Sequence, residues 1–506
     1  MRLEKSLITV GGLTSVSRLF GLLREMLMSH FLGASVIADA FIVAFKFPNF
    51  FRRFFAEGAF NAAFVPEFAG VLASQGKLQA KEVANQVFTW LTCILCIFVG
   101  LVVIFTPSII HIIAPGFCDT PDRLAYAIEF TRITFPYILF ISLAALLSGV
   151  LNSLNRFAAA AATPVLLNIF MILALLLVVE KPGFALCVGV ISAGVVQFMW
   201  LYYAAAKQGF NLRLQKPVLS PSVSRILTLM VPGAIGAGVM QINIFVDMIL
   251  ASTLPTGSLS FLYYADRLNQ LPLSVFGVAI GTVLLPNLSK ALRLGNNKDA
   301  VNLQEKAISL GLRLSIPSAL GLVLLAYPII NLIYGHGSFS SESVMATAPA
   351  LAAFAIGLPA YILSKVFTTG FFAMQNTKTP LKIGLITVAV NLFLNLLLIG
   401  QFLHVGMALA TGFAAWVQAF LLAFKLREKS LITFSLDFFK DLSSVLLASF
   451  CMAVVIYQLQ IWVPYPVSII KAVIYVFGLV GIGITTYVAV YKACLITSHY
   501  KKTRVR

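Results

Sequence analysis

Apolar runs long enough to cross a bilayer recur along the whole chain, with short polar breaks between them. Each run predicts a transmembrane helix, because about 20 apolar residues span the hydrocarbon core and a helix bonds its own backbone groups. The fourteen runs lie at 5–30, 36–70, 86–113, 124–151, 160–180, 184–206, 224–252, 257–288, 306–334, 344–374, 380–400, 404–425, 438–462 and 467–494. The first run contains Arg18, Arg24 and Glu25, so it is not expected to be a cleavable signal sequence.

Composition supports the same fold class. Of 506 residues, 60% are hydrophobic and only 11% are charged, which no soluble domain of this length would tolerate on its surface. We therefore predict an all-α polytopic membrane protein.

The net charge of +18 is distributed as expected for a membrane protein rather than a nucleic-acid binder. If the N-terminus is cytoplasmic, the even-numbered connections are cytoplasmic too, and these hold most of the loop Lys and Arg residues. The basic positions are Lys77, Lys81, Arg156, 207–216, 290–298, Lys378, Lys382 and 425–429. The connections 31–35, 253–256, 335–343 and 463–466 have no Lys or Arg. Both termini are therefore predicted to be cytoplasmic, with no nucleic-acid partner.

Motifs for energy-coupling chemistry are missing from the sequence. It has no Walker motif, nucleotide-binding glycine loop or HExxH, so an ATP-driven pump within this chain is not expected and transport would use a gradient. Cys93 and Cys96 form a CxxC inside a predicted helix without a second ligand pair, and are interpreted as packing residues. The other cysteines are Cys118, Cys187, Cys451 and Cys494.

A weak internal repeat appears when the chain is shifted by about 220 residues, which is typical of transporters built from two related bundles. Pro66 aligns with Pro286 and Asn49 with Asn269. The segments 135–139 and 358–363 also correspond, with Gly149 near Gly370 and Asn155 near Asn376.

Six crossings separate equivalent elements, so the repeats are parallel and related by a pseudo-twofold axis along the membrane normal. The predicted domains are an N-terminal lobe at 1–215, a C-terminal lobe at 216–430, and helices thirteen and fourteen with a basic tail at 431–506. The last two helices have no counterpart in this scheme. A substrate site is expected in a central cavity between the lobes.

Ionisable groups inside membrane helices cost about 2.5–3.5 kcal/mol each on insertion scales and usually face water or a partner. Arg18 and Arg52 lie mid-span, and Lys365 does so in the second lobe. Arg24, Arg53 and Lys46 either share a cavity with them, snorkel to headgroups, or pair with Glu25, Asp39 and Glu57.

The four arginines Arg18, Arg24, Arg52 and Arg267 would together make a cationic cavity, and forked guanidinium groups suit phosphate oxygens. Asp266 would either neutralise its neighbour Arg267 or lie beside it in the cavity. Pro48-Asn49 interrupts a helix beside Arg52, which either frees amide groups for an anion or only kinks the helix.

Five segments carry a resemblance to a known family. They are SRLFGLLRE (17–25), ADAFIVAFKFPNFFRRFFAEGAFNAAFVP (38–66), APGF (114–117), TFPYILFISLAALLSGVLNSLNRF (134–157) and YYADRLNQLPLSVFGVAIGTVLLP (263–286). The chain resembles the MurJ (MviN) family of the multidrug, oligosaccharidyl-lipid and polysaccharide exporter superfamily along essentially its whole length.

This resemblance implies a flippase in the bacterial inner membrane, which moves lipid II to the periplasmic leaflet for peptidoglycan synthesis by alternating access. It implies cargo contacts at Arg18, Arg24, Arg52 and Arg267, with Ser17, Asp39, Asn49 and Glu57 in support. Helices thirteen and fourteen would form a groove for the lipid tail. The implied partners are lipid II, membrane phospholipid and the cell-wall synthesis machinery, with the chain itself a monomer.

The resemblance also implies a sodium site in the second lobe, as in some family members. The matching residues are Asp247, Asn391, Asn395, Met407 and Thr411. The family's second ligand on helix eleven is acidic, and Asn395 departs from it. The alternative interpretation is that these amides only bond between helices.

Two other function classes remain open from the residues alone. A sister exporter of the same fold would carry another polyprenyl-pyrophosphate-linked sugar or a cationic drug, although a cationic drug would prefer an acidic cavity. A membrane-embedded glycosyl- or phosphotransferase would need clustered acids for Mg²⁺, and the loops offer only scattered acids such as Asp299 and Glu305.

Overall fold

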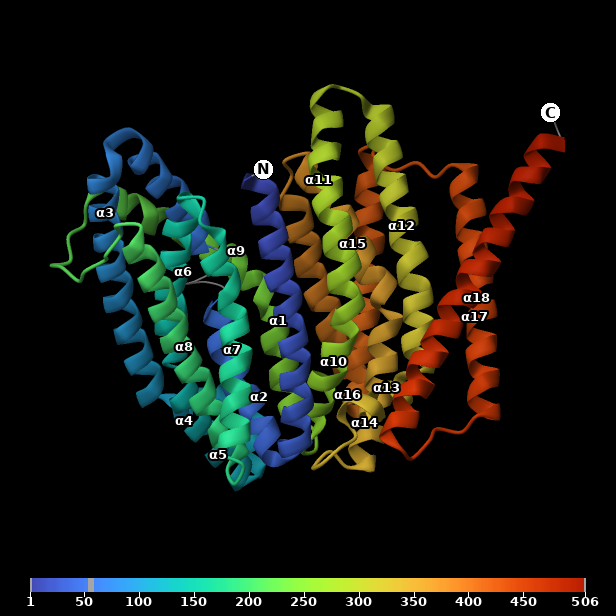
Figure 1. The fold of residues 1–506 in the computed structure, drawn as a ribbon, viewed down its shortest axis with the longest axis horizontal. Coiled ribbons are helices and arrows are strands. Elements are labelled where there is room, and N and C mark those ends of the chain that lie inside the picture. The colour runs from blue at the N-terminus through green and yellow to red at the C-terminus, as the bar shows by residue number, and fades with distance from the viewer. Residues whose placement is uncertain (1, 53–58, 505–506) are drawn as a thin grey trace. The chain divides into compact units, whose positions relative to one another are not determined.

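The computed structural model describes residues 2–52 and 59–504, and this part of the chain is helical without any strand. It forms two compact units (Figure 1). The first comprises Met1–Ser260 and Gly337–Phe339, and the second comprises Phe261–His336 and Ser340–Arg506. The all-α class predicted from the apolar runs is confirmed.

The first unit contains the helices up to the start of α10. They are α1 (Arg2–Leu32), α2 (Val36–Arg52), α3 (Ala59–Ile104), α4 (Thr106–Ile113), the short 3₁₀ helix η2 (Pro115–Asp119), α5 (Pro121–Thr134), α6 (Tyr137–Ser153), α7 (Phe157–Leu177), α8 (Pro182–Lys207) and α9 (Pro221–Ser252).

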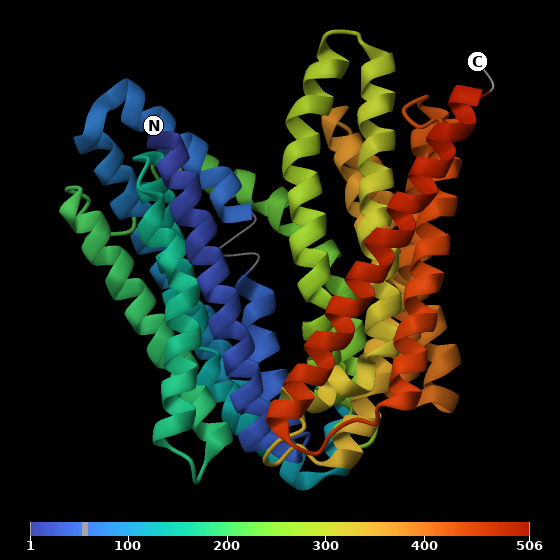
Figure 2. The ribbon, with the colours of Figure 1, turned by 45° about the vertical axis from the view of Figure 1, so that its right-hand side comes forward.

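The second unit contains the remaining helices. They are α10 (Ser258–Pro272), the short π-helix η3 (Leu273–Gly277), α11 (Val278–Arg293), α12 (Asn297–Leu324), α13 (Ala326–Tyr334), α14 (Ser341–Ile356), α15 (Leu358–Ala373), α16 (Lys378–Glu428), α17 (Leu436–Trp462) and α18 (Ile469–Arg504). Within this unit α11 and α12 run as a hairpin, and α17 and α18 lie side by side (Figure 2).

Each predicted run is mostly helical where the structure describes it. Among the described residues, nine helical stretches are long and apolar enough to cross a membrane. Some of these stretches join two predicted runs, so the number of fourteen crossings stays a prediction.

The helix boundaries differ from the predicted ones at several places. The run 124–151 is divided between α5 and α6, 306–334 between α12 and α13, and 344–374 between α14 and α15. In the described part of the run 36–70, α2 extends to Arg52 and α3 begins at Ala59 and continues past Pro66 to a kink at Gly76, which has a φ of 83°. The runs 380–400 and 404–425 are two helical segments within α16, separated by a kink at Leu403 (φ 50°, ψ -130°). The predicted break between these two runs is therefore confirmed.

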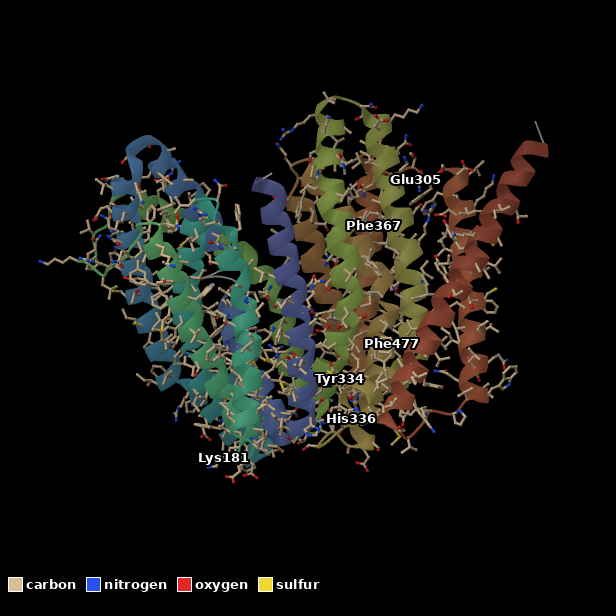
Figure 3. The ribbon with its side chains drawn as sticks, viewed as in Figure 1. Lys181, Glu305, Tyr334, His336, Phe367 and Phe477 are labelled. Atoms are coloured by element: carbon tan, nitrogen blue, oxygen red, sulfur yellow. The ribbon has the colours of Figure 1, made fainter. Side chains whose placement is uncertain are left out.

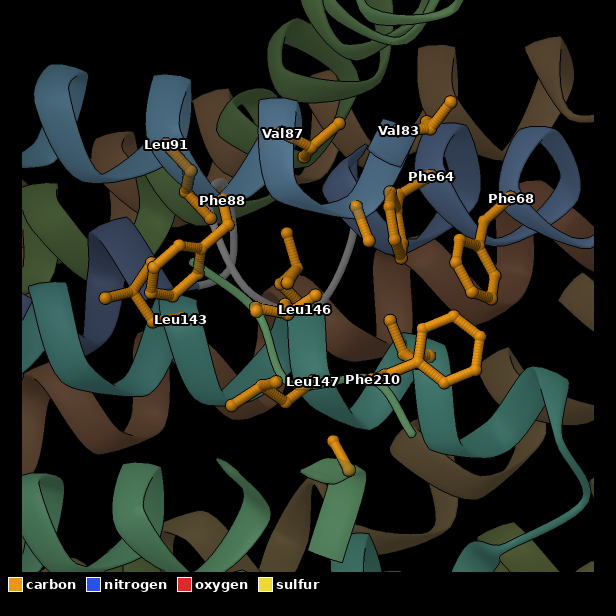
Figure 4. Close-up of a cluster of buried hydrophobic side chains, with 14 of the residues drawn as sticks. Phe64, Phe68, Val83, Val87, Phe88, Leu91, Leu143, Leu146, Leu147 and Phe210 are labelled. Atoms are coloured by element: carbon orange, nitrogen blue, oxygen red, sulfur yellow. The ribbon is translucent and has the colours of Figure 1, made fainter. Parts of the chain in front are cut away.

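The core of the first unit is built on a phenylalanine ladder (Figure 4). Phe60, Phe64 and Phe68 follow each other at intervals of four on α3, and their ring centroids are 5.3 Å apart at each step. Phe210 closes the ladder at 5.6 Å from Phe68, and Leu147 of α6 is fully buried in the same cluster. Spacing by four places side chains on one face of a helix, which is why this sequence builds a continuous apolar ridge.

The core of the second unit repeats this ridge after an offset of 220 residues. Ile280, Leu284 and Leu288 are buried on α11 and correspond to the three phenylalanines of α3. The helices α4 and α13 begin at the same offset, as do the N-caps of α5 and α14. The duplication predicted from the sequence therefore has a structural counterpart in each unit.

The same offset corrects one detail of the sequence alignment. Asn155 (φ 59°) and Gln375 (φ 58°) occupy the left-handed position after α6 and α15, respectively. Asn155 therefore corresponds to Gln375 rather than to Asn376. The backbone turn fixes this register, whereas the sequence comparison matched the two asparagines by identity.

The start of α17 repeats the start of α9. Ser220 caps α9 and donates its hydroxyl to Gln86 on α3, and Ser435 caps α17 and donates its hydroxyl to Glu305 on α12. The start of the thirteenth predicted helix, α17, thus has a local counterpart in the start of the seventh predicted helix, α9. The sequence alignment does not show this correspondence. The Trp90 indole of α3 also donates to Val218 O at 3.1 Å, so α9 packs within the first compact unit although the repeat places it in the second lobe.

Replacement of Leu147 by Ala should lower the free energy of unfolding by about 2–5 kcal/mol, because a fully buried side chain is removed from a packed core. Thermal unfolding of the purified protein in detergent would measure the effect. Leu78→Ala is the matched control, since Leu78 is 87% exposed and should change the midpoint little. Equal shifts for both variants would contradict the assignment of this core.

Candidate functional site

Arg18 and Arg24 of α1 lie in different environments. Arg18 is exposed, and no residue in the described ranges bonds to its side chain. Arg24 is 8% exposed and is held within the first unit. The sequence had placed both at the same cavity wall. Another predicted residue, Glu57, lies outside the described residues.

The Arg24 guanidinium belongs to a polar cluster between α1 and α7, here called the α1–α7 cluster. Nη1 donates to Asn168 Oδ1 at 2.9 Å, and Nη2 pairs with Glu25. Asn168 Nδ2 donates in turn to Ser17 O at 2.9 Å. One of the alternatives left open by the sequence, the pairing of Arg24 with Glu25, is therefore observed.

Asn168 was not among the predicted site residues. It is 6% exposed on an apolar helix, and it connects the backbone at Ser17 with the guanidinium of Arg24. The sequence did contain a signal, since an amide within an apolar run of a membrane helix needs a partner. The partner itself was not readable, because it lies 144 positions away.

Asp39 is completely buried and forms an ion pair with Arg123 of α5, with Oδ2 and Nη2 2.7 Å apart. The carboxylate also accepts from Gly257 N at 2.8 Å, from Ser260 N at 2.9 Å and from Ser260 Oγ at 2.6 Å. Four donors thus satisfy a charge that would be expensive to bury alone. This pairing differs from the suggested partners Arg24, Arg53 and Lys46.

The two charges stabilise the ends of two consecutive helices. Asp39 accepts from amides at the start of α10, where free N–H groups and the helix dipole favour an anion. Arg123 Nη1 lies 3.4 Å from Ser252 O and 3.3 Å from Leu254 O at the end of α9. Its guanidinium carbon lies 4.0 Å from the ring centre of Phe117. The pair therefore clamps the turn between α9 and α10.

Arg123 is a second buried charge that the apolar runs do not mark. It stands three residues after the N-cap of α5, just before the predicted run 124–151. Its exposed fraction of 2% shows that a charge at the edge of an apolar run can be a core residue. Only the tertiary structure supplies the carboxylate that makes this possible.

The break at Pro48 is repaired inside the first unit. Proline has no N–H, so the carbonyl of Ala44 loses its helical donor, and Thr134 Oγ1 donates to that oxygen at 2.8 Å. Asn49 Nδ2 donates to Phe45 O at 2.7 Å. The interruption therefore frees a carbonyl, which Thr134 satisfies, as expected from the alternative in which Pro48 only kinks the helix.

Arg52 is the last residue of α2 and is half-buried, and it directly follows Phe51 of an aromatic cluster in the chain. The rings are those of Phe47, Phe50, Phe51, Phe98, Phe135 and Phe245. Centroids of Phe50 and Phe245 are 4.1 Å apart, so α2 and α9 are in contact here.

In the second unit, Arg267 lies on α10 with its guanidinium carbon 4.7 Å from the ring centre of Tyr263. Asp266 accepts from the side chain of Gln270. The helix then changes to the π-helix η3, where the aliphatic part of Lys365 lies against Gly277. Short π segments often occur near functional sites.

Four of the five predicted sodium ligands lie together on α16. Asn395 Nδ2 donates to Asn391 Oδ1 at 3.0 Å, Asn391 Nδ2 lies 3.4 Å from Thr411 Oγ1, and Thr411 donates to Met407 O at 3.0 Å. Asp247 belongs to the first compact unit and accepts from Asn243 at 3.0 Å. The amide bonds are those expected from the interhelical interpretation, and the oxygens are also of the type that a hard cation prefers.

A metal centre of the His, Cys, Asp or Glu type is not present among the described residues. Cys93 and Cys96 are both free and exposed on α3. They do not pack in the interior of the unit, so their interpretation as packing residues applies at most to a lipid-facing surface.

Replacement of Arg123 by Gln should destabilise the protein by about 3–5 kcal/mol, because the buried carboxylate of Asp39 would lose its counter-charge. The melting temperature in detergent would report this loss. Arg132→Gln on the same helix serves as the control, since Arg132 is exposed. A native melting temperature for the Arg123 variant would show that the pair does not clamp the fold.

Comparison with known proteins gives consistent matches over most of the chain. The family model described as "Lipid II flippase MurJ" matches residues 28–478. The "Probable lipid II flippase MurJ" of Rhizobium meliloti is 40% identical over 475 residues, which cover 92% of this chain and 89% of that protein. The "Lipid II flippase MurJ" of Burkholderia cenocepacia is 36% identical over 438 residues, 85% of each protein.

Solved structures match as well. A structure titled "Lipid II flippase MurJ, inward closed conformation" superposes with a TM-score of 0.83 at 28% identity and covers 99% of this chain and 100% of that one. An inward-facing multidrug resistance transporter of the MATE family has a TM-score of 0.67 at 16% identity, covering 82% of this chain and 95% of that one. The second match shows a shared fold only.

Proposed function

The chain belongs to the lipid II flippase MurJ family, and we propose that it moves lipid II by alternating access, with arginines of its membrane helices binding the pyrophosphate of the cargo. It is a transporter rather than an enzyme, and a multi-pass protein of the inner membrane. Membership of the MurJ family distinguishes the chain from the drug exporters that share its fold.

The environment of Arg18 carries the proposal. Its side chain is exposed in the middle of the long helix α1, and within the described residues it has no bonded partner. A permanently charged group in a membrane helix needs either a counter-charge or a watery, anion-accepting space. The fork of a guanidinium matches two phosphate oxygens, and lipid II carries a pyrophosphate between its prenyl tail and its sugar.

Arg24 has a second role in this proposal. Because Asn168 and Glu25 hold its guanidinium, Arg24 fixes α1 against α7 one to two turns from Arg18. Ser17 contributes through its backbone oxygen, which fixes Asn168. The cluster would thus keep α1 oriented while Arg18 remains open to cargo.

Arg52 and Arg267 are assigned to cargo binding on the same chemical grounds, one in each compact unit. Asp39 is assigned to the support of the fold around α9 and α10, since its oxygens are occupied by four donors. Asn49 supports α2 through its bond to Phe45 O. The proposal retains Glu57 as a supporting residue from the sequence resemblance.

The proposed direction of transport comes from the family resemblance, which implies movement from the cytoplasmic to the periplasmic leaflet. The proposed topology places both termini and the positive connections on the cytoplasmic side. An inside-negative potential favours outward movement of anionic cargo by about 2.3 kcal/mol per charge per 100 mV. We further propose that the chain acts as a monomer that delivers lipid II to the cell-wall synthesis machinery.

Arg18→Ala should abolish flipping, and Arg18→Lys should restore it only in part because an ammonium lacks the fork. The test is to deplete the native protein from cells, express each variant, and measure whether lipid II becomes accessible to an enzyme acting only outside. Arg132→Ala, which removes an exposed charge elsewhere, should behave as the native chain. Full restoration by Arg18→Ala would exclude the assigned role.

Sodium coupling is a second part of the proposal and rests on the oxygens of α16. We propose that Asn391, Asn395, Met407 and Thr411, together with Asp247, form the sodium site that the family resemblance implies. Asn395 places an amide where the family has an acid, so affinity should be low.

In proteoliposomes with the potential held constant, a sodium gradient should raise the rate of lipid II flipping, and Asn395→Asp should lower the sodium concentration required. The added carboxylate supplies a charged oxygen for a hard cation. If flipping by the native chain and the variant is independent of sodium but stops when the potential is collapsed, voltage is the driver and the sodium proposal falls.

A further inference from the structure

A second cluster of charged side chains lies in the second unit, apart from the residues assigned to cargo or sodium. It joins α12 to α17 and α18 through Arg313, Asp441, Tyr487 and Tyr491, and is here called the Arg313 cluster. Glu305, labelled in Figure 3, marks the part of α12 about two turns away from Arg313.

Asp441 is almost fully satisfied inside the cluster. Arg313 Nε lies 3.0 Å from Oδ1 and 2.9 Å from Oδ2, and Tyr491 Oη donates to Oδ1 at 2.6 Å. Tyr487 Oη donates to Arg313 O at 2.8 Å. The Asp441 side chain is 11% exposed. The ion pair therefore uses the N–H of Nε and leaves the N–H donors of the two terminal nitrogens available.

Arg313 is only partly used by these bonds. The carboxylate meets Nε alone, and no residue of the described chain accepts a bond from Nη1 or Nη2. The Arg313 side chain is 41% exposed, in contrast to Arg24 and Arg123, whose terminal nitrogens are buried and bonded. A pure helix-to-helix staple would bring the carboxylate to the terminal fork, where two parallel bonds form. Here the guanidinium carbon lies 5.6 Å from the ring centre of Tyr491, and the two terminal nitrogens carry four N–H donors on a partly exposed side chain.

The depth of the cluster indicates what meets these donors. Asp441 is five residues from the start of α17, about 8 Å along the axis, which is close to the thickness of one headgroup layer. Tyrosines such as Tyr487 and Tyr491 are enriched at this level of membrane helices. Lys440 and Lys492, both exposed, are the chain neighbours of Asp441 and Tyr491. The surroundings are therefore interfacial and carry an excess of positive charge.

We propose that Arg313 binds the phosphate of a lipid, and that the Arg313 cluster is a lipid-phosphate site on the face where α17 and α18 join α12. Asp441 accepts from Nε and so leaves Nη1 and Nη2 available. These two nitrogens donate to two oxygens of a phosphate or pyrophosphate ester. A phospholipid headgroup and a prenyl pyrophosphate share this chemistry. Asp441 is thus a positioning residue, and Arg313 is the ligand-binding group.

The experiment measures binding of two probes to the full-length chain in nanodiscs of neutral phosphatidylcholine. The probes are fluorescent phosphatidylglycerol and a fluorescent prenyl pyrophosphate. Arg313→Gln should weaken binding of at least one probe about tenfold, because both terminal donors to the phosphate are changed and the charge is lost. Loss confined to phosphatidylglycerol identifies a structural lipid, and loss confined to the pyrophosphate identifies a docking position for cargo.

Variants of Asp441 separate binding from folding. Asp441→Asn removes the competing anion but keeps an oxygen for Nε, so it should bind the probes as well as or more tightly than the native chain. If the pair only stabilised the fold, Arg313→Gln and Asp441→Asn would weaken probe binding equally. The double variant Arg313→Gln with Asp441→Asn leaves no uncompensated charge, so it keeps the test valid if Arg313→Gln alone does not fold.

Two results would overturn the proposal. One is native affinity for both probes in the folded double variant. The other is equal weakening by Arg313→Gln and by Tyr487→Phe, which removes only the bond to the Arg313 backbone oxygen. Arg313→Lys should give intermediate affinity, since it keeps the charge and loses the fork.

Discussion

This structure depends on one constraint: buried polar groups must find partners inside the chain. The ion pair of Asp39 and Arg123, both almost completely buried, is the clearest case. Bilayer hydrocarbon offers neither group a hydrogen bond. Each charge therefore serves a helix end as well as its partner, with Asp39 at the amides that open α10 and Arg123 at the carbonyls that close α9. Thr134 gives a second case: its hydroxyl donates to the Ala44 carbonyl oxygen, which has no helical donor because Pro48 lacks an N–H.

Much of the fold was predictable because membrane helices have a strong one-dimensional signal. Apolar runs gave the helices, and the repeat gave an offset that recurs in buried positions such as Phe64 and Leu284. The errors fall where a helix ends inside an apolar run without a polar loop. The break between α5 and α6 is at Phe135-Pro136, and the break between α14 and α15 is at Gly357, so the apolar pattern continues through both.

The candidate site was less predictable, because the sequence shows which groups are charged but not what meets them. Arg18 and Arg24 look equivalent along the chain, yet Asn168 holds only Arg24. Arg123 lies outside the apolar runs and is a core residue, while Asp39 looked like a supporting ligand and is already occupied. Arginines in this protein thus differ by how many of their donors the fold has used, from Arg123 through Arg313 to Arg18.

The repeated starts of α9 and α17 suggest how such a protein could grow. In both places a serine-capped helix leaves a connection and is bonded through its cap to a helix of the preceding bundle, at Gln86 in one case and Glu305 in the other. The apolar length of such a helix places it in the membrane, and the capping serine with one acceptor bonds its start to the older bundle. An extension at the C-terminus built in this way adds lipid-facing surface without disturbing the older core.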